Sequence, residues 1–371
     1  MAETIIQFGA GNFLRAFADL FIAQANRDPA TRLGQIVVVQ STDRARADAL
    51  NAAAGRYHVA IQGYAAGQVV NEVEAVDSIS RALYAGTQWS EVSAVACSPD
   101  LRWILSNTTE AGFALDDRDG QLQPGCGQTP YSFPAKLLDV LLARHAAGLP
   151  APAIVPCELI ENNGQKLREL VLTQAVRWSV EPAAQSWLRE ACRWVDNLVD
   201  RIVPGPPETH PLKAADPLLL SAEPFAFWGV QVQGDQTFFK HPAVTLTADL
   251  APYYLRKVRI LNGAHTALVA YAMPLGLKTV RECVEHPDVG PWLARVLAEE
   301  IVPVITERAP EAEAFARATL DRFRNPFLNH ALSSIALNHE AKVKVRLLPT
   351  LTDYHARFGR SAPLLSSVLG I

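Results

Sequence analysis

Cysteine is scarce in this sequence, and no two cysteines form a CxxC pair. The five present are widely spaced and odd in number: Cys97, Cys126, Cys157, Cys192 and Cys283. This pattern favours neither a disulfide framework nor a thiolate zinc site, and it fits a reducing compartment. Apolar runs are also short, since none reaches the roughly 18 residues of a membrane span. The first residues lack the basic and apolar segments of a signal peptide, so we expect a cytoplasmic protein without a membrane partner.

A large excess of one charge is missing as well. Lys and Arg number 34 against 38 Asp and Glu, which gives a net charge of -4. The cations are scattered singly and form no basic stripe, which argues against a nucleic-acid partner and for a small-molecule substrate. With 371 residues, 49% of them hydrophobic, the chain is long enough for two domains.

Strand and helix periodicities alternate in the first two thirds of the chain. An apolar run at 5–8, a glycine turn and a helical pattern lead to a second run at 36–39, as in a βαβ unit. Further strands are predicted at 103–105 and 153–156, and a hairpin around Gly67 is predicted as an insertion in the parallel sheet. Residues 163–200 have a helical pattern. The fold class is therefore α/β: a Rossmann-type doubly wound sheet with an inserted hairpin over 1–250.

From residue 251 to 371 the periodicity is almost wholly helical. Helices are predicted near 252–274, 290–307, 311–323 and 327–340. We therefore expect a mostly α-helical C-terminal domain for substrate binding and catalysis, with the boundary near residue 250.

The first chemical motif is Gly9-Ala10-Gly11, between a predicted strand and a helix beginning at Asn12 and Phe13. Two glycines allow a sharp turn and let the backbone approach a pyrophosphate at the helix start. The third glycine of the usual fingerprint is absent, because Leu14 takes that place. An ordinary turn remains the alternative to dinucleotide binding.

Asp43 follows the second strand, where a carboxylate binds the adenosine ribose and disfavours a 2'-phosphate. This position predicts NAD as the cofactor. Its neighbours Ser41, Thr42 and Arg44 are types that accept a 2'-phosphate, and a helix N-cap is the alternative role for Asp43.

Two polar loops follow later predicted strands, at the sheet edge where open α/β sheets bind ligands. The first holds Asn107, Thr108 and Glu110, which we assign to the cofactor, and the second runs from Cys157 to Gly164. Turns and helix caps are the alternative for both loops.

Lys257, Asn262 and His265 form the candidate catalytic set. On an α-helix they fall within an arc of roughly 140°. Oxidation of an alcohol without a metal needs a base and donors to the developing alkoxide, and lysine can be that base if burial or the nearby Arg256 and Arg259 lower its pKa. The alternatives are a solvated lysine, a helix break at Asn262 and a core histidine.

The ordered motifs resemble the mannitol dehydrogenase family of polyol-specific long-chain dehydrogenases. The resemblance runs from residue 5 to about residue 350 and rests on these segments: Gln7–Phe17, Ser106–Gly112, Ser132–Leu137, Pro156–Gly164 and Leu261–His265. It implies a metal-independent, NAD-dependent oxidoreductase that interconverts a ketose acid and a hexonate, or a polyol and its ketose. It also implies Lys257 as the general acid/base.

Substrate residues follow from the same resemblance. Asp200 matches a site-lining segment, and Arg324 lies in another, Arg322–Pro326. Leu159 replaces an asparagine of polyol-oxidising relatives, so Asn163 or Asn162 is expected to take over. A sugar acid needs a cation, and the candidates are Arg259, Arg324, Lys136, Lys240 and His241. A dinucleotide-binding sensor without catalysis is the rival from another class.

Overall fold

The computed structural model describes residues 1–234 and 236–370, apart from the side chain of Glu110. These residues form two compact units. The first comprises residues 1–60, 73–222 and 226–248; the second comprises 61–72, 223–225 and 249 onward. The sequence predicted one boundary near 250, whereas here the chain passes between the units several times. No helix in the described ranges is long and apolar enough to cross a membrane.

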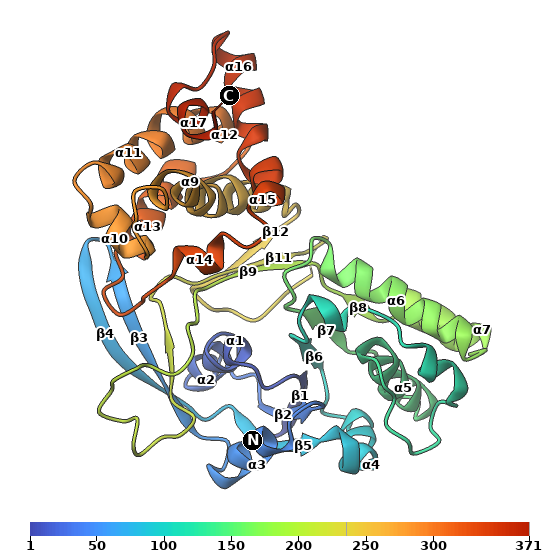
Figure 1. Ribbon diagram of the computed structural model, residues 1–371. Helices are drawn as coiled ribbons and strands as arrows, with labels where there is room; N and C mark the ends of the chain where they lie inside the picture. The colour runs from blue at the N-terminus through green and yellow to red at the C-terminus, as the bar shows by residue number, and fades with distance from the viewer. Residues whose placement is uncertain (235, 371) are drawn as a thin grey trace. The chain divides into compact units, whose positions relative to one another are not determined.

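A parallel six-stranded sheet organises the first unit (Figure 1). Its order, β5-β2-β1-β6-β7-β8, confirms the predicted doubly wound sheet. The strands are β1 (Glu3–Phe8), β2 (Gln35–Gln40), β5 (Ile79–Tyr84), β6 (Trp103–Ser106), β7 (Ala153–Pro156) and β8 (Arg193–Trp194). Phe8 pairs with Val39 and with Ser106, and Ser106 pairs with Pro156. The carboxyl ends of four neighbouring strands therefore meet at one edge.

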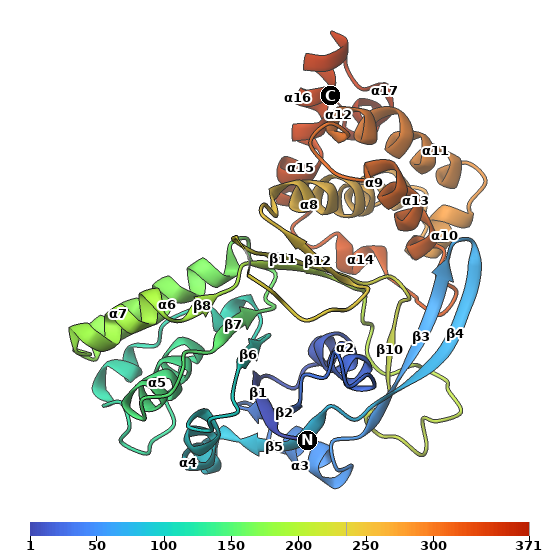
Figure 2. The ribbon, with the colours of Figure 1, turned by 180° about the vertical axis from the view of Figure 1, so that it is seen from behind.

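Helices cover both faces of this sheet, as Figures 1 and 2 show. Alternation along β1 sends Ile6 and Phe8 into a core with four helices, and Gln7 to the other face, where it meets Asp19 of α2. The helices are α1 (Asn12–Arg15), α2 (Ala18–Asn26), α3 (Arg44–Ala52), α4 (Ala85–Ala96), α5 (Phe133–Ala146), α6 (Asn163–Arg177) and α7 (Pro182–Glu190). Ser132 caps α5 by accepting a hydrogen bond from Ala135, and Pro134 occupies its first turn as predicted.

Two predictions in this region need correction. The hairpin, β3 (Tyr57–Ala65) and β4 (Gln68–Val76), turns at Gly67 as expected but belongs to a separate sheet of order β10-β3-β4, with β10 at Leu220–Ala222. Residues 163–200 are not helical throughout, because β8 and β9 (Asn197–Asp200) follow α7. The sequence analysis also missed a third sheet, in which β9 pairs with β11 (Phe227–Gln231) and β11 with β12 (Val244–Thr247).

Helices make up most of the second unit. They are α8 (Ala251–Arg256), α9 (Gly263–Ala272), α10 (Val280–Glu285), α11 (Val289–Arg295), α12 (Val302–Ile305), α13 (Ala312–Phe323), α14 (Leu332–Ile335), α15 (His339–Arg346), α16 (Leu348–Phe358) and α17 (Pro363–Leu369). π-helical turns at Lys257–Asn262 and Val296–Ile301 join two pairs of them. The predicted helix near 327–340 is wrong in extent, since 336–338 separate α14 from α15.

A buried ion pair ties two segments of the second unit together. Arg322 of α13 binds Glu223 through Nε and Nη2, at 2.9 and 2.8 Å, and both side chains are only 2% exposed. The Arg322 guanidinium also lies 4.3 Å from the centroid of the Phe225 ring. Two parallel charge-assisted hydrogen bonds fix residues 223–225 against α13.

Replacing Arg322 with Leu should destabilise the protein by about 3–5 kcal/mol, because the two charge-assisted hydrogen bonds to the buried carboxylate of Glu223 would be lost. The measurement is the free energy of unfolding in urea. Arg324→Leu is the matched control, since Arg324 is exposed and its pair with Asp321 spans 3.5 Å; it should change stability by about 1 kcal/mol or less. Equal effects of the two substitutions would contradict the assignment.

Candidate active site

The glycine turn after β1 has the geometry that a dinucleotide requires. Gly9 has φ +107°, and a Cβ there would lie 3.0 Å from the carbonyl oxygen of Asn107. Gly11 has an ordinary φ of -65°, yet nothing lies within 4 Å of the place where its Cβ would be. Gln40 supports the turn by accepting a hydrogen bond from the amide of Ala10 at 3.3 Å. Gly9 is thus required by the fold, whereas Gly11 leaves space above its backbone.

The helix after the turn is shorter than the sequence indicated. α1 spans only Asn12–Arg15, and a non-helical Phe17 (φ -129°, ψ -91°) precedes α2. Asn12 accepts a hydrogen bond from Arg15, and the rings of Phe13 and Phe17 stack with centroids 4.9 Å apart. Both cofactor candidates, Asn12 and Phe13, are therefore held at the rim of the turn.

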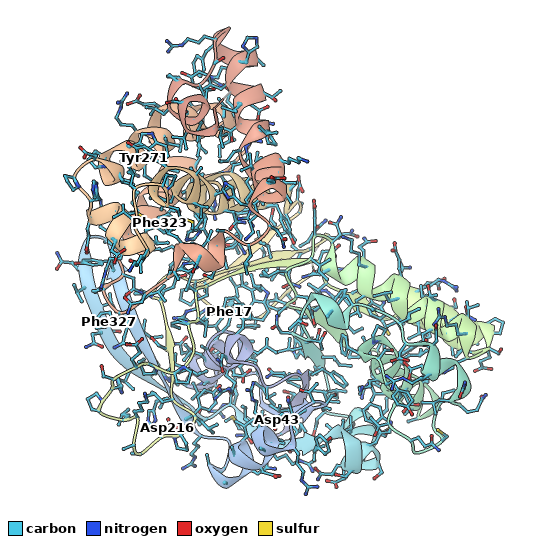
Figure 3. All side chains as sticks on the ribbon, viewed as in Figure 1. Phe17, Asp43, Asp216, Tyr271, Phe323 and Phe327 are labelled. Carbon is cyan, nitrogen blue, oxygen red and sulfur yellow. The ribbon has the colours of Figure 1, made fainter. Side chains whose placement is uncertain are left out.

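Asp43 is exposed and caps α3 by accepting a hydrogen bond from Ala45 at 3.0 Å (Figure 3). Asp43 therefore has the N-cap role that the sequence analysis gave as an alternative to ribose binding, and this role uses Oδ1 of its carboxylate. Arg46, one turn into α3, was missed by sequence reasoning: its Nη1 lies 3.4 Å from the carbonyl oxygen of Ala10. Nothing in the residue pattern marks this arginine, because it reaches the turn only once β1 and β2 are paired.

A cavity of about 400 Å³ lies between the loops after β6 and β7, lined by Asn107, Thr109, Ala111, Glu158 and Leu159. The two loops that the sequence placed on one rim therefore do lie together. Asn107 donates to the carbonyl of Cys157 at 2.7 Å, and the backbone of Thr108 donates to Glu158 at 2.8 Å. Glu110 begins a 3-10 turn, and its side chain is outside the part that the structure describes.

Glu158 is the main residue of this rim to which the sequence analysis gave no role. Its carboxyl also accepts hydrogen bonds from the hydroxyls of Ser106 and Thr108, both at 3.1 Å. Burial, with the side chain 2% exposed, raises the pKa of Glu158, although these hydrogen bonds oppose the shift. The residue joins the ends of β6 and β7 and carries a carboxyl group to the cavity wall.

The expectation that Asn163 contacts substrate is corrected. Its amide donates to the carbonyls of Pro156, Glu158 and Asn197, at 2.8 to 3.1 Å, and its oxygen accepts from the amides of Gly164 and Asn197. A side-chain amide has two N–H groups and one oxygen, so none is left for a ligand. Asn163 anchors the start of α6 instead.

Lys257 and Asn262 lie at the two ends of a π-helical turn, Lys257–Asn262. In a π-helix the hydrogen bonds run from i to i+5, so a turn takes more residues than in an α-helix and residues five apart lie nearer to one face. The α-helical arc expected from the sequence was therefore too wide. π turns are rare and frequent at functional sites.

His265 lies three residues beyond, in α9, and is 8% exposed. Its ring packs 4.2 Å from that of Phe323 and 5.0 Å from that of His330. Figure 3 labels Phe323 among the helices of this unit. Burial lowers the pKa of His330. The imidazole of His265 is thus oriented by aromatic packing against α13 and the segment before α14.

The structure also shows the surroundings of the residues proposed to bind the carboxylate of the substrate. Arg259 is buried, and its Nε and Nη2 donate to Thr350 and Asp353 of α16, so part of its guanidinium is engaged within the fold. Burial, helped by the nearby charge of Arg201, lowers the pKa of His241 to about 4, which disfavours it as the cation for a carboxylate. Arg324 and Lys240 are exposed, and Asp200 ends β9, 5% exposed.

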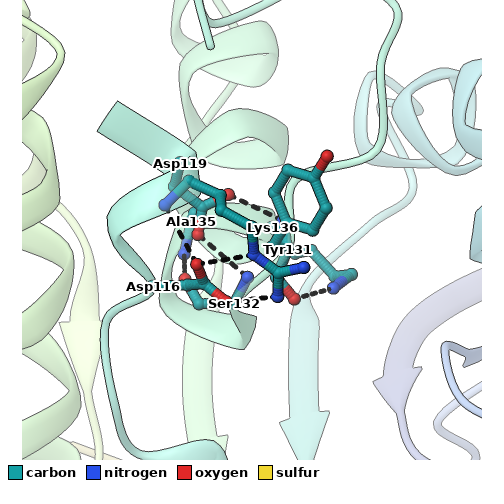
Figure 4. A network of polar contacts seen from close by, with 7 residues as sticks. Asp116, Asp119, Tyr131, Ser132, Ala135 and Lys136 are labelled. Carbon is teal, nitrogen blue, oxygen red and sulfur yellow. Dashed lines mark hydrogen bonds and ion pairs between the residues drawn. The ribbon is translucent and has the colours of Figure 1, made fainter. Parts of the chain in front are cut away.

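Lys136 has a local partner, as Figure 4 shows. Its Nζ donates to the carbonyl of Tyr131 at 2.6 Å, and burial lowers its pKa to about 8 against the opposing charges of Asp119 and Asp116. Asp119 accepts from the backbone amides of Tyr131 and Ser132 at 2.6 and 2.9 Å. Lys136 therefore holds the loop before α5 and is not a free cation.

Family models match nearly the whole chain. The mannitol dehydrogenase Rossmann domain matches residues 3–242, and the mannitol dehydrogenase C-terminal domain matches residues 249–370. The chain belongs to the mannitol dehydrogenase family.

Relatives within this family are similar over most of their length. Altronate oxidoreductase of Bacillus subtilis is 40% identical over 373 residues, which cover 96% of this chain and 76% of the relative. Altronate oxidoreductase of Bacteroides thetaiotaomicron is 38% identical over 379 residues, 96% of this chain and 77% of the relative.

Solved structures of the mannitol dehydrogenase fold agree. D-sorbitol dehydrogenase in substrate-free form superposes with a TM-score of 0.85 at 22% identity, covering 98% of this chain and 78% of that one. Mannitol 2-dehydrogenase of Pseudomonas fluorescens, in ternary complex with NAD and D-mannitol, gives 0.76 at 23% identity, covering 99% and 77%.

The two glycines of the turn should respond differently to alanine. Gly9→Ala should lower the melting temperature, because φ +107° and the carbonyl of Asn107 both oppose a Cβ. Gly11→Ala should leave the melting temperature unchanged but weaken NADH binding at least tenfold, since only a ligand would meet the new methyl group. Fluorescence titration with NADH measures the second effect. Unaltered affinity in Gly11→Ala would show that no cofactor lies over this turn.

Stability should depend on pH through Asp19, which is fully buried beside Tyr57 and Gln7. Burial raises the pKa of this carboxyl from 3.8 to about 7. The folded protein then holds a proton that the unfolded chain releases, so this stabilisation is full below pH 3.8 and is lost as pH rises toward 7, by about 1.4 kcal/mol per unit at most.

Asp19→Asn should remove this dependence, so it should raise the melting temperature relative to the wild type more at pH 8 than at pH 5. Thermal unfolding at both pH values checks it. Asp48→Asn, an exposed carboxylate on α3, is the control and should leave the pH dependence as it is. The prediction fails if the stability of the wild type changes between pH 5 and pH 8 by the same amount as the stability of Asp19→Asn.

Proposed function

We propose that the chain is an NAD-dependent oxidoreductase that interconverts tagaturonate, a ketose acid, and altronate, the corresponding hexonate. The observation that supports the proposal is the π turn, which begins at Lys257 and ends at Asn262 and so brings these two residues nearer to one face of the helix than an α-helix would. The relatives at 38–40% identity, named altronate oxidoreductase, support the choice of substrate within the family.

The glycine turn fits a dinucleotide. Open space above Gly11, the amide groups at the start of α1 and the exposed carboxylate of Asp43 are the features that such a ligand needs. Asn107 and Thr108 would line the same rim, with Asn12 and Phe13 beside the turn. When bound, NAD supplies or accepts the hydride.

The chain's own groups handle the proton and the oxygen. In reduction, the Lys257 ammonium gives its proton to the ketone oxygen of the substrate; in oxidation, the neutral amine takes the proton from the hydroxyl. Asn262 and His265 donate hydrogen bonds to that oxygen, which stabilises the negative charge that develops on it. Arg324 is the cation proposed for the distant carboxylate, with Asp200 at the sugar hydroxyls.

Substrate choice is tested by following NADH oxidation with tagaturonate, fructuronate and fructose. Tagaturonate should give the highest kcat/KM, with fructose lowest because it has no carboxylate. A preference for fructuronate would assign a mannonate dehydrogenase, and a preference for fructose a polyol dehydrogenase. Binding of NADH without turnover on any of the three would instead support a dinucleotide-binding sensor.

Lys257→Ala should lower kcat by about 10²–10⁴-fold, because general acid–base catalysis contributes that much. NADH affinity should stay within twofold of the wild type. Lys344→Ala is the matched control, an exposed lysine of the same unit on α15, and it should keep full activity. Wild-type turnover in Lys257→Ala would remove the proposed mechanism.

A further inference from the structure

The π turn at Lys257–Asn262 has two sides. The residues at its ends, Lys257 and Asn262, belong to the proposed catalytic set. Arg259 follows Lys257 by two residues, so on a turn of about four to five residues it lies roughly 145–180° away around the helix. Its side chain is buried, with the residue 5% exposed, and it reaches α16. The turn therefore has the proposed catalytic residues nearer to one side and a buried arginine on the other.

Arg259 is held by α16 at two of its nitrogen atoms. Nε donates to the hydroxyl of Thr350 at 2.8 Å, and Nη2 donates to the carboxylate of Asp353. Thr350 and Asp353 are three residues apart and so lie on one face of α16. Burial lowers the pKa of Arg259, whereas the hydrogen bond and the charge of Asp353 oppose this shift. Without Asp353, the buried guanidinium would lose the anion that compensates its burial.

A second contact holds the end of the same turn. Thr266 of α9 is fully buried, and its hydroxyl donates to the carbonyl of Asn262 at 2.8 Å. The same hydroxyl accepts a hydrogen bond from Nη1 of Arg346 at 3.3 Å. Arg346 ends α15, which lies beside α9 in Figures 1 and 2, and the buried Leu347 joins α15 to α16. The pair α15–α16 therefore contacts the turn in its middle and at its end.

The register of this turn affects where the proposed catalytic groups stand. In an α-helix, two residues five apart differ by about 140° around the axis. In the π turn they lie nearer to one face, although π turns are rare and α-helix is the common state of such a segment. A return to α-helical bonding would therefore move Asn262 away from Lys257. Contacts that hold the turn from the opposite side oppose this change.

We infer that Asp353 is a positioning residue: through Arg259 it keeps the π turn in the register that holds Lys257 and Asn262 near one face. The inference rests on the proposed function, in which these two residues act on the substrate oxygen. Thr350 is the second acceptor of the same arginine. A misplacement of about 1 Å at reacting groups can cost on the order of 10²-fold in rate, so this contact should affect turnover.

Asp353→Leu should lower kcat at least tenfold while NADH affinity stays within twofold of the wild type. Arg308→Met is the matched control. Arg308 donates to the same carboxylate oxygen of Asp353 at 2.6 Å, but its side chain is 53% exposed and it follows α12. This control removes an ion pair of Asp353 and leaves the contact with the turn, so kcat should stay within twofold. A tenfold loss in Arg308→Met as well would overturn the inference.

A double-mutant cycle tests whether Asp353 acts through Arg259. Arg259→Met alone should also lower kcat at least tenfold. The double variant should be within twofold of the slower single variant, because both substitutions remove one contact. Losses that multiply would contradict the inference. Should Asp353→Leu fail to fold, as unfolding in urea would show, Asp353→Asn keeps the shape and one acceptor oxygen and should still lower kcat at least threefold.

Hydrogen exchange of the backbone amides gives a readout that does not need activity. In Asp353→Leu, exchange over residues 257–266 should be at least tenfold faster than in the wild type, with α11 of the same unit unchanged. Arg308→Met should change neither. Wild-type turnover in Lys257→Ala would overturn the proposed mechanism together with this inference. Loss of turnover in Lys257→Ala, with full kcat in Asp353→Leu and Arg259→Met, would overturn this inference alone.

Discussion

The register of the parallel sheet is the constraint on which the first unit's site depends. Phe8 pairs with Val39 and Ser106, and Ser106 pairs with Pro156, so the chain leaves four strands at the same level. Gly9 then donates its amide to Val39, and Asn107 donates to Phe8. A shift by one residue would reverse which face each side chain occupies. The glycine turn, Asn107 and Glu158 are neighbours only because this register holds.

Much of this arrangement follows from the sequence, because short apolar strands separated by helices leave few topologies. The turn at Gly9–Gly11, the strands β6 and β7 and the helix opened by Pro134 were all predicted from local patterns. Asp200 is an example of what local sequence patterns cannot predict. It ends a strand in a segment with helical periodicity, and β9 is stabilised by pairing with β11, about thirty residues away. Local patterns contain no information about such a partner.

The sequence proposed candidate site residues, but it could not show which of their polar groups the fold itself uses. Asn163 has the polarity expected of a substrate ligand, yet its hydrogen-bonding groups are all used within the fold, and Arg259 likewise donates from Nη2 to Asp353. The π turn at Lys257 has no signature in residue type, because i to i+5 bonding depends on how α8 and α9 pack. Tertiary partners decided which polar groups stay available for a ligand.

Buried arginines elsewhere in the chain show how the fold normally treats this side chain. Arg144 donates to the carbonyls of Ala96, Ser98, Leu101 and Pro150, and Arg322 faces the carboxylate of Glu223. In both cases protein oxygen atoms accept the hydrogen bonds that water would accept from an exposed guanidinium. This matters because an unpaired buried charge is costly. Arg193 departs from this rule at the edge of the same sheet. Its Nη1 donates to the carbonyl of Thr237 at 2.6 Å, but its Nε and Nη2 are buried and have no hydrogen-bond partner among the described residues.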